Sequence, residues 1–442
     1  MKKYLIALSL LLATALPSQC GVLTVRDQAT VVNELLADRL ENLLPAIMEQ
    51  TGIDMWVLVS REYNEDPVLK TMLPAEWLNA RRRTMLVFYR DPVKKTVERL
   101  AVARYAVGKS IAAAWDTQKF PDQWDALADI IKVRNPNQIA LNTSRHFGHA
   151  DGIDHTDYTE LVGALPARFR SRVVSAEALA IRWLETRSER EMHIYPQLVD
   201  ATHKIIDEGF SERVITPGIT TTDDVVWWFR QKIRDLGYDT WFHPSVEIQR
   251  ASKGPAGSKG LADPNVIVPG DLLHVDIGIT YLRLNTDVQQ HAYVLKPGER
   301  TAPAALTRAF VQANRLQDIL LAQFKQGRSG NQVLAGALAQ ARAENITPTI
   351  YSHPLGYHGH AAGPAIGMWD MQGGVPGSGD DTLRYRTAYS IELNAASVLQ
   401  GWSAPVRIML EEDAYFDESG VRYLAGRQKA LHLIPRQGAA AD

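Results

Sequence analysis

Cysteine is almost absent from this sequence, because Cys20 is the only one among 442 residues. The chain therefore forms no internal disulfide and no cysteine-based zinc site, so histidines and carboxylates would have to bind any metal. An excess of charge is also lacking, since 48 Lys and Arg balance 50 Asp and Glu. This balance excludes the basic footprint of a nucleic-acid-binding or polybasic membrane-binding protein. The hydrophobic content of 45% is typical of a globular protein that buries a sizeable core.

Long hydrophobic runs are missing except near the N-terminus. Lys2 and Lys3 precede an apolar run from Leu5 to Leu16, which is shorter than the roughly 20 residues of a membrane-spanning helix. We therefore expect residues 1–20 to be a signal peptide and the protein to be exported, to the periplasm. The residues before Cys20 resemble a lipoprotein cleavage site, so a lipid anchor at this cysteine is the alternative.

The order of the expected elements divides the chain into two halves. In residues 28–175, β-prone runs at 55–59, 84–89 and 138–142 alternate with a helix at 125–133, which favours an α/β domain with a supporting role. The charged stretch Glu185–Glu191 marks the junction. Residues 185–435 combine strand-like runs with helical stripes, including one that could start at Pro196 and one from an N-cap at Thr222 to Gly237. This half is predicted to be α+β.

Two aspartates in the second half lie on strand-like runs. The alternation of Leu272–Ile279 puts Asp276 on the polar face, and Asp287 follows eleven residues later. If the two runs form a hairpin that turns at Tyr281-Leu282, these aspartates lie about opposite each other, with Cβ atoms roughly 4.5–5.5 Å apart. Two carboxylates so close repel unless a cation lies between them. For this pair alone, the alternative is two solvated aspartates on an exposed hairpin.

Three further segments carry residues of the same kind. Glu392 lies on the polar face of the run 390–394, and strand parity in the run 406–416 favours Glu411 as the inward side chain, with Glu412 as the alternative. The third segment, which lies between the aspartate runs and the run 390–394, contains three histidines within eight residues, which are His353, His358 and His360.

Taken in their order along the chain, the motifs resemble the pita-bread metallopeptidase family, which includes aminopeptidase P, prolidase, methionine aminopeptidase and the related creatinase. Its members carry Asp, Asp, His, Glu and Glu as ligands of two metal ions, with the same eleven-residue spacing of the aspartates. The resemblance implies a pita-bread fold over about 185–435, after a creatinase-type N-terminal domain. It implies that His360 contacts the substrate carbonyl and that Glu392 shuttles a proton. The implied metal ligands are Asp276, Asp287, His353, Glu392 and Glu411.

The chain departs from the family pattern at three places. Lys259 occupies the position of a family histidine seventeen residues before the first aspartate, so we expect it to contact substrate; the alternative is a solvent-exposed lysine in the loop 251–264. Alanines follow His360 where the family commonly has glutamate, and Leu393-Asn394 replaces a Pro-Gly pair. These differences affect the expected substrate preference and turnover, and leave the ligand set intact.

The expected function follows from this ligand set. Four carboxylates and one imidazole suit manganese and could accept cobalt, iron or zinc, and paired divalent ions activate a water for attack on a carbonyl. We expect an exported peptidase with two divalent metal ions that removes the N-terminal residue from peptides, with Xaa-Pro bonds as the expected targets. A non-catalytic metal- or peptide-binding protein on the same fold and a metal-free creatinase-like C–N hydrolase are the alternatives. The sequence leaves open whether the protein forms a homodimer.

Overall fold

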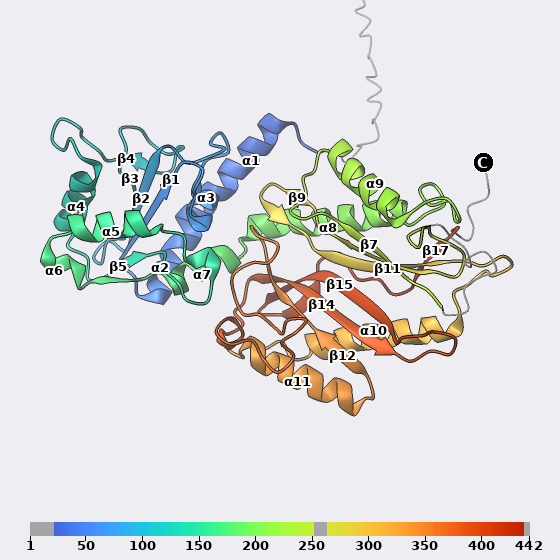
Figure 1. The fold of residues 1–442 in the computed structure, drawn as a ribbon. Coiled ribbons are helices and arrows are strands. Elements are labelled where there is room, and N and C mark those ends of the chain that lie inside the picture. Colours follow the sequence, from blue (N-terminus) through green and yellow to red (C-terminus); the bar gives the residue numbers. More distant parts are fainter. Residues whose placement is uncertain (1–21, 252–262, 437–442) are drawn as a thin grey trace, which may run out of the picture.

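Two lobes, each built on its own β-sheet, form the protein (Figure 1). The computed structural model describes residues 22–251 and 263–436, so the expected signal peptide lies outside the described residues. We call residues 22–185 the first lobe and the remaining described residues the second lobe. None of the helices within these ranges combines the length and apolar character needed to cross a bilayer.

The first lobe contains a six-stranded mixed sheet of order β4-β3-β2-β1-β5-β6. Even-numbered residues of the central strand, such as Trp56 and Leu58, pack into one core, and odd-numbered ones, such as Val57, pack into another. Both faces of this strand are buried, which explains its uninterrupted hydrophobic run. The strands are β1 (Met55–Arg61), β2 (Arg83–Arg90), β3 (Val97–Ala101), β4 (Ala112–Ala113), β5 (Ile139–Leu141) and β6 (Val173–Ser175).

Helices cover both faces of this sheet. The first helix passes through a π-helical turn, η1 (Arg39–Leu43), into the second, and the helix predicted at 125–133 is present as α4. The helices are α1 (Val25–Asp38), α2 (Leu44–Thr51), α3 (Pro67–Met72), α4 (Gln123–Arg134), η2 (Gly148–Ala150), α5 (His155–Ala164), α6 (Ala167–Arg170) and α7 (Glu177–Glu185).

The second lobe contains a nine-stranded sheet, with the path β12-β14-β15-β11-β8-β7. Three short strands are attached to it: β13 pairs with β14, β16 with β15, and β17 with β11. A small hairpin of β9 (Thr280–Tyr281) and β10 (Leu284–Asn285) projects from it. The strands of the sheet are β7 (Ser245–Gln249), β8 (Leu272–Ile277), β11 (Val288–Val294), β12 (Thr347–Ile350), β13 (His353–Leu355), β14 (Thr387–Ser397), β15 (Val406–Asp417), β16 (Gly420–Tyr423) and β17 (His432–Ile434).

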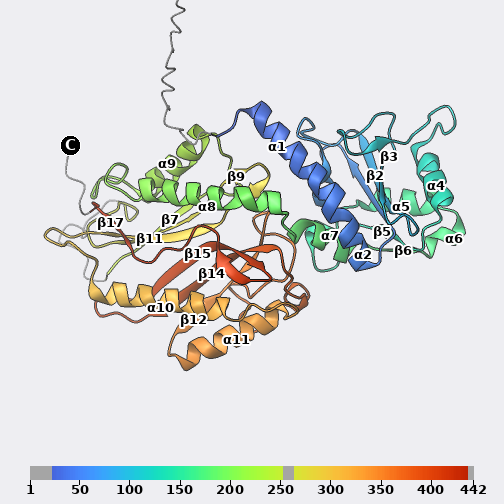
Figure 2. The same ribbon diagram turned by 180° about the vertical axis from the view of Figure 1, so that it is seen from behind.

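Four long helices lie along this sheet (Figure 2): α8 (Glu189–Gly209), α9 (Thr222–Asp235), α10 (Ala304–Leu321) and α11 (Gly330–Ala343). Val275 and Ile277 of β8 share a core with α8 and α9. Ile391 of β14 and Leu410 of β15 share a core with α10 and α11. Because side chains alternate along a strand, Asp276, Glu392 and Glu411 point to the opposite face.

The predicted helix starts are wrong by up to seven residues. The helix placed at Pro196 begins at Glu189, where Ser188 and Glu191 form a capping box, and Pro196 lies inside the helix. The N-cap of α9 is Thr221, one residue before the predicted Thr222. The start of α8 is hard to recognise in the charged stretch Glu185–Glu191, because Glu191 is buried and is part of the capping box of this helix.

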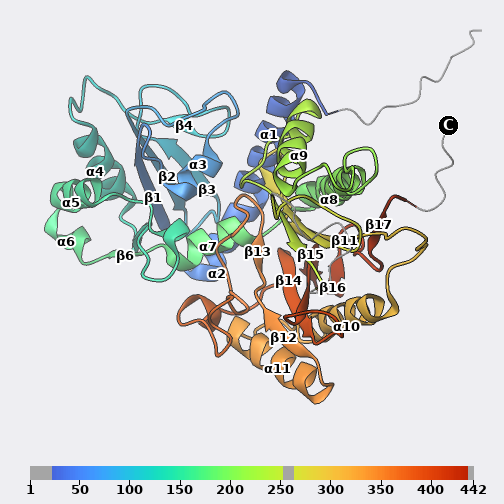
Figure 3. The same ribbon diagram turned by 45° about the vertical axis from the view of Figure 1, so that its right-hand side comes forward.

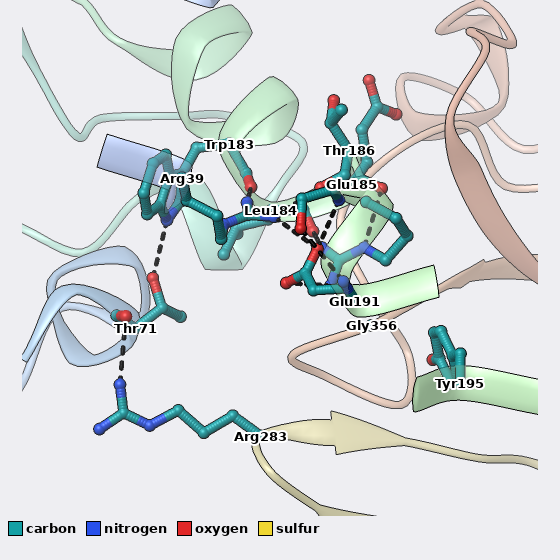
Figure 4. Close-up of polar contacts among 12 residues, drawn as sticks. Arg39, Thr71, Trp183, Leu184, Glu185, Thr186, Glu191, Tyr195, Arg283 and Gly356 are labelled. Carbon is teal, nitrogen blue, oxygen red and sulfur yellow. Dashed lines mark hydrogen bonds and ion pairs between the residues drawn. The ribbon is translucent and has the colours of Figure 1, made fainter. Parts of the chain in front are cut away.

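A buried ion-pair cluster joins the two lobes at this junction (Figure 4). Arg39 Nη1 of η1 donates to Glu191 Oε2 at 2.9 Å, and Arg187 Nη1 lies 3.4 Å from Glu191 Oε1. Both guanidinium groups also donate to the last carbonyls of α7, which satisfies groups that a helix end leaves unpaired. The ring of Tyr357 lies 5.0 Å from the Arg39 guanidinium and 5.1 Å from that of Arg187. The cluster therefore holds the histidine-rich loop 353–360 against the first lobe.

The lobes also meet at the start of the described chain. The described chain enters α1 from the side of the second lobe (Figure 3), and the backbone N–H of Leu23 donates to the Tyr281 hydroxyl at 3.0 Å. The hairpin of β9 and β10 is therefore in contact with the first lobe.

Candidate metal centre

One row of side chains crosses four strands on the face away from the helices. Glu392 of β14 is paired with Glu411 of β15, Glu411 with Gln289 of β11, and Gln289 with Asp276 of β8. Directly paired residues place their side chains on the same face of a sheet. Three carboxylates and one amide therefore lie side by side.

Asp287 lies directly before β11, and its predicted pairing with Asp276 is wrong. The hairpin turns at Leu282-Arg283, one residue later than predicted, so Gln289 lies opposite Asp276. A shift of two residues in pairing keeps the same face. Asp276 and Asp287 are consequently diagonal neighbours, and ligand atoms of Asp276, Asp287 and Glu411 lie within 4.8 Å of one another.

His353 completes a second cluster that shares Glu411 with the first. Its Nε2 lies 3.7 Å from Asp287 Oδ2, 3.8 Å from Glu392 Oε2 and 3.8 Å from Glu411 Oε1. Among the described residues, no group hydrogen-bonds His353 Nε2 or Asp276 Oδ1, although both atoms are buried. Buried polar atoms without partners are costly. Two adjoining clusters of oxygen and imidazole donors therefore fit divalent cations.

The electrostatics of the carboxylates lead to the same conclusion. Burial raises the pKa of Asp276, Asp287 and Glu392 well above the usual range, and the neighbouring carboxylates raise it further. Burial lowers the pKa of His353 to about 3, so its imidazole is neutral and available as a ligand at neutral pH. Carboxylates this close share a negative charge that cations would compensate.

Gln289 is a site residue that the sequence reasoning missed. Its Nε2 donates to Glu392 Oε1 and to Glu411 Oε2, both at 2.7 Å. Its Oε1 lies 2.8 Å from His274 Nε2, and because an amide oxygen only accepts, this histidine nitrogen carries the proton. Burial lowers the pKa of His274 to about 4, which keeps its ring neutral. The amide thus holds two candidate ligands in place and is itself oriented by His274.

The three histidines of the loop have different surroundings. The exposed His360 lies 4.7 Å from His353 between ring centroids, and it belongs to a cluster with His353 and Asp287. His358 instead packs on His149, with ring centroids 4.4 Å apart. His149 comes from η2 of the first lobe, and no periodicity in the sequence indicates that it reaches this region.

The alternative ligand Glu412 lies away from the clusters. Glu412 points to the helix-covered face, where its Oε2 lies 2.6 Å from His203 Nε2 of α8 and its Oε1 accepts from Gln290 at 3.1 Å. The structure therefore brings Glu411, and not Glu412, to the other ligands, as strand parity predicted. Lys259 lies outside the described residues, so its predicted contact with substrate stays a prediction.

A cavity of about 860 Å³ adjoins the metal centre and is lined by both lobes. His360, His358 and Trp241 line it from the second lobe, and His149 lines it from the first. The cavity reaches the metal centre at His360, which shares a cluster with His353 and Asp287.

Comparison with known proteins identifies the family. The model of metallopeptidase family M24 matches residues 197–422, whereas no curated relative matches the sequence. An X-Pro aminopeptidase from Thermotoga maritima is similar in structure, with a TM-score of 0.61, 16% identity, and coverage of 88% of this chain and 99% of that one.

Two dipeptidases are also similar in structure. For the Xaa-Pro dipeptidase from Bacillus anthracis the TM-score is 0.55 with 15% identity over 93% of this chain and 100% of that one. For a dipeptidase from Mycobacterium ulcerans the TM-score is 0.58 with 18% identity, and the match covers 92% of this chain and 99% of that one. These likenesses confirm the predicted pita-bread fold class. Since the family match spans more than half of the sequence, the chain belongs to metallopeptidase family M24.

Proposed function

We propose that this protein is an exported peptidase that binds two divalent metal ions and removes the N-terminal residue from peptides, with Xaa-Pro bonds as its targets. The observation that carries the proposal is the pair of adjoining clusters that share Glu411, with the buried atoms His353 Nε2 and Asp276 Oδ1 left without partners among the described residues. Membership of family M24 implies a peptide substrate and a metal requirement. The similar X-Pro aminopeptidase and Xaa-Pro dipeptidase support the choice of bond.

The metal would be held by Asp276, Asp287, His353, Glu392 and Glu411. Four carboxylates and one imidazole suit manganese best, with cobalt, iron or zinc as alternatives. Bound divalent ions supply Lewis acidity, which lowers the pKa of a water and polarises a carbonyl.

The protein's own residues then position the substrate and move a proton. Glu392 lies in the ligand row, and burial together with Glu411 raises the pKa of its carboxyl group, which suits a group that takes a proton from water and gives it to the leaving amine. His360 lines the cavity and lies beside His353. Burial lowers the pKa of His360, so a neutral imidazole would donate its N–H to the substrate carbonyl oxygen as negative charge develops there.

The test is product identification with a matched ligand variant. Protein freed of metal by a chelator and reloaded with Mn²⁺ is incubated with Ala-Pro-Ala, and the products are separated by mass. We expect free alanine and Pro-Ala, and neither product from Asp287→Asn. Intact Ala-Pro-Ala and other Xaa-Pro peptides after incubation with fully loaded wild-type protein would refute the peptidase proposal.

Export rests on the segment 1–20 and has its own test. The basic Lys2-Lys3 pair and the apolar run that follows support cleavage by a signal peptidase. Expression of the full chain in a Gram-negative host should give a shortened periplasmic protein. Full-length protein retained in the cytoplasm would refute export, and a lipid-modified Cys20 would move the protein to a membrane surface.

A further inference from the structure

The wall of the cavity between the lobes contains a guanidinium whose hydrogen-bond partners, among the described residues, are backbone carbonyls. Arg283 lines the cavity from the tip of the β9–β10 hairpin. Its Nη1 donates across the lobe boundary to the carbonyls of Leu73, at 2.7 Å, and Thr71, at 3.3 Å (Figure 4). Within residues 22–251 and 263–436, no carboxylate lies within ion-pair distance of Arg283, and the exposed Glu76 acts on it only through its charge. Burial lowers the pKa of the Arg283 guanidinium, and the charges of Tyr357 and Glu76 raise it by less. A partly buried guanidinium with only carbonyl partners is suited to bind an anion.

The backbone at this position indicates that the arginine is needed for its side chain. Leu282 and Arg283 have φ angles of 52° and 67°. A two-residue hairpin turn of this kind strongly prefers Asn-Gly, because other side chains rarely adopt positive φ. Such strain persists where the surrounding structure requires it, often at ligand sites. Here Leu282 is buried and Arg283 reaches the opposite lobe.

The separation between Arg283 and the metal centre limits the length of a peptide that could reach both. Arg283 precedes Asp287 by four residues, so at about 3.3–3.6 Å per residue their Cα atoms lie at most about 14 Å apart. An extended peptide advances by a similar distance per residue, about 3.3–3.6 Å. With its first carbonyl at the metal centre, a peptide of three or four residues would bring its C-terminal carboxylate within reach of the guanidinium.

Lys70 adds a second positive charge to the same cavity. It lies on α3 next to Thr71, and its Nζ donates to the carbonyl of Leu78 at 2.7 Å. Asp239 is the acidic side chain among the described residues that line the cavity. The charge at the Arg283 side therefore favours a negative group.

We propose that Arg283 binds the free C-terminal carboxylate of the substrate, so that the preferred substrates are peptides of three or four residues. This inference rests on the proposed peptidase function and specifies its substrate class. A carboxylate would accept from the donors of the guanidinium that Leu73 and Thr71 do not occupy.

The experiment compares each peptide with its C-terminal amide. Ala-Pro-Ala and Ala-Pro-Ala-Ala are measured as free acids and as amides with the Mn²⁺-loaded wild-type protein and with Arg283→Gln. We expect kcat/KM to be about tenfold or more higher for the acids in the wild type, and the ratio to fall to about one in the variant. Arg283→Lys should give an intermediate ratio, because it keeps the charge and loses the fork.

The ratio of kcat/KM for acid and amide distinguishes two roles of Arg283, which are binding of the substrate carboxylate and support of the contact between the lobes. If Arg283 only ties the lobes together, Arg283→Gln lowers kcat/KM for acid and amide equally and the ratio stays unchanged, which would overturn the proposal. Arg386→Gln is the matched control, because Arg386 is also an arginine at positive φ, 68°, and pairs with Glu189 away from the cavity. It should keep the wild-type ratio.

Calorimetric binding of the same peptides distinguishes failure of this inference from failure of the proposed function. Acid-selective binding that depends on Arg283, without hydrolysis, would support the carboxylate site and contradict the peptidase proposal. Hydrolysis with equal kcat/KM for acids and amides in the wild type would contradict the carboxylate site alone. Neither hydrolysis nor acid-selective binding would overturn both.

Discussion

Replacing Gln289 with leucine should weaken metal binding while the protein remains folded. The substitution removes two hydrogen bonds of 2.7 Å to Glu392 and Glu411, and it leaves His274 Nε2 without its acceptor. Hydrogen bonds to charged groups contribute about 1.5–3 kcal/mol each, and loss of partners that orient metal ligands typically lowers affinity about 10–100-fold. We therefore expect the dissociation constant for Mn²⁺ to rise by about 10–100-fold, which corresponds to about 1.4–2.7 kcal/mol.

The control is the neighbouring glutamine on the other face of the same strand. Gln290 is also buried, donates to Glu412 Oε1 at 3.1 Å and lies 2.9 Å from His432 Nε2. Gln290→Leu should lower the free energy of unfolding about as much as Gln289→Leu does, because each substitution removes buried hydrogen bonds. It should leave the affinity for Mn²⁺ unchanged. Affinity is measured by competition with a fluorescent chelator, and folding by circular dichroism. A folded Gln289→Leu variant with affinity within twofold of wild type, or an equal loss in Gln290→Leu, would refute the positioning role of Gln289.

Three further predictions concern Glu411, His203 and Arg39. Glu411→Gln should lose more metal affinity than Glu412→Gln, because the clusters share Glu411 while Glu412 faces α8; metal content per chain checks this order, and the reverse order would contradict it. Burial lowers the pKa of His203, but the hydrogen bond and charge of Glu412 raise it more, so the net shift is upward. The pair should therefore stabilise the protein fully below the usual histidine value of about 6.5 and lose this contribution as pH rises through the raised pKa, so the unfolding free energies of wild type and His203→Gln should converge at high pH; a difference that grows with pH would contradict the sign. Arg39→Met should lower the free energy of unfolding by about 3–5 kcal/mol, because it removes a partner from the buried carboxylate of Glu191; denaturant unfolding measures this, and a change below about 1 kcal/mol would contradict it.

The positions of the ligands could be predicted largely because strand parity is robust. Alternation alone puts Asp276, Glu392 and Glu411 on one face, and it separates Glu411 from Glu412. The residue pairing between β8 and β11 is harder to predict, because it depends on where the hairpin turns. Leu282-Arg283 carries none of the usual hairpin-turn residues. The sequence therefore predicts the turn one residue too early and does not indicate that Gln289 is the partner of Asp276.

Contacts across the lobes could not be predicted from local patterns. His149 reaches the cavity from the first lobe, and Arg39 lies 152 residues before its partner Glu191. The charged stretch Glu185–Glu191 predicts a domain boundary, because charged residues are mostly exposed. In the structure Arg187 and Glu191 are buried and paired. Their spacing of four residues is compatible with an ion pair on a helix, but it indicates neither their burial nor the contact of Glu191 with Arg39.

The central claim is that two divalent ions at the clustered carboxylates support removal of an N-terminal residue. The most direct measurement is a titration of Mn²⁺ into chelator-treated protein, with release of alanine from Ala-Pro-Ala as the readout. We expect alanine release to depend on added metal, to reach its maximum at two ions per chain, and to be absent in Asp287→Asn. Two bound ions per chain without any release of alanine from Ala-Pro-Ala would contradict it.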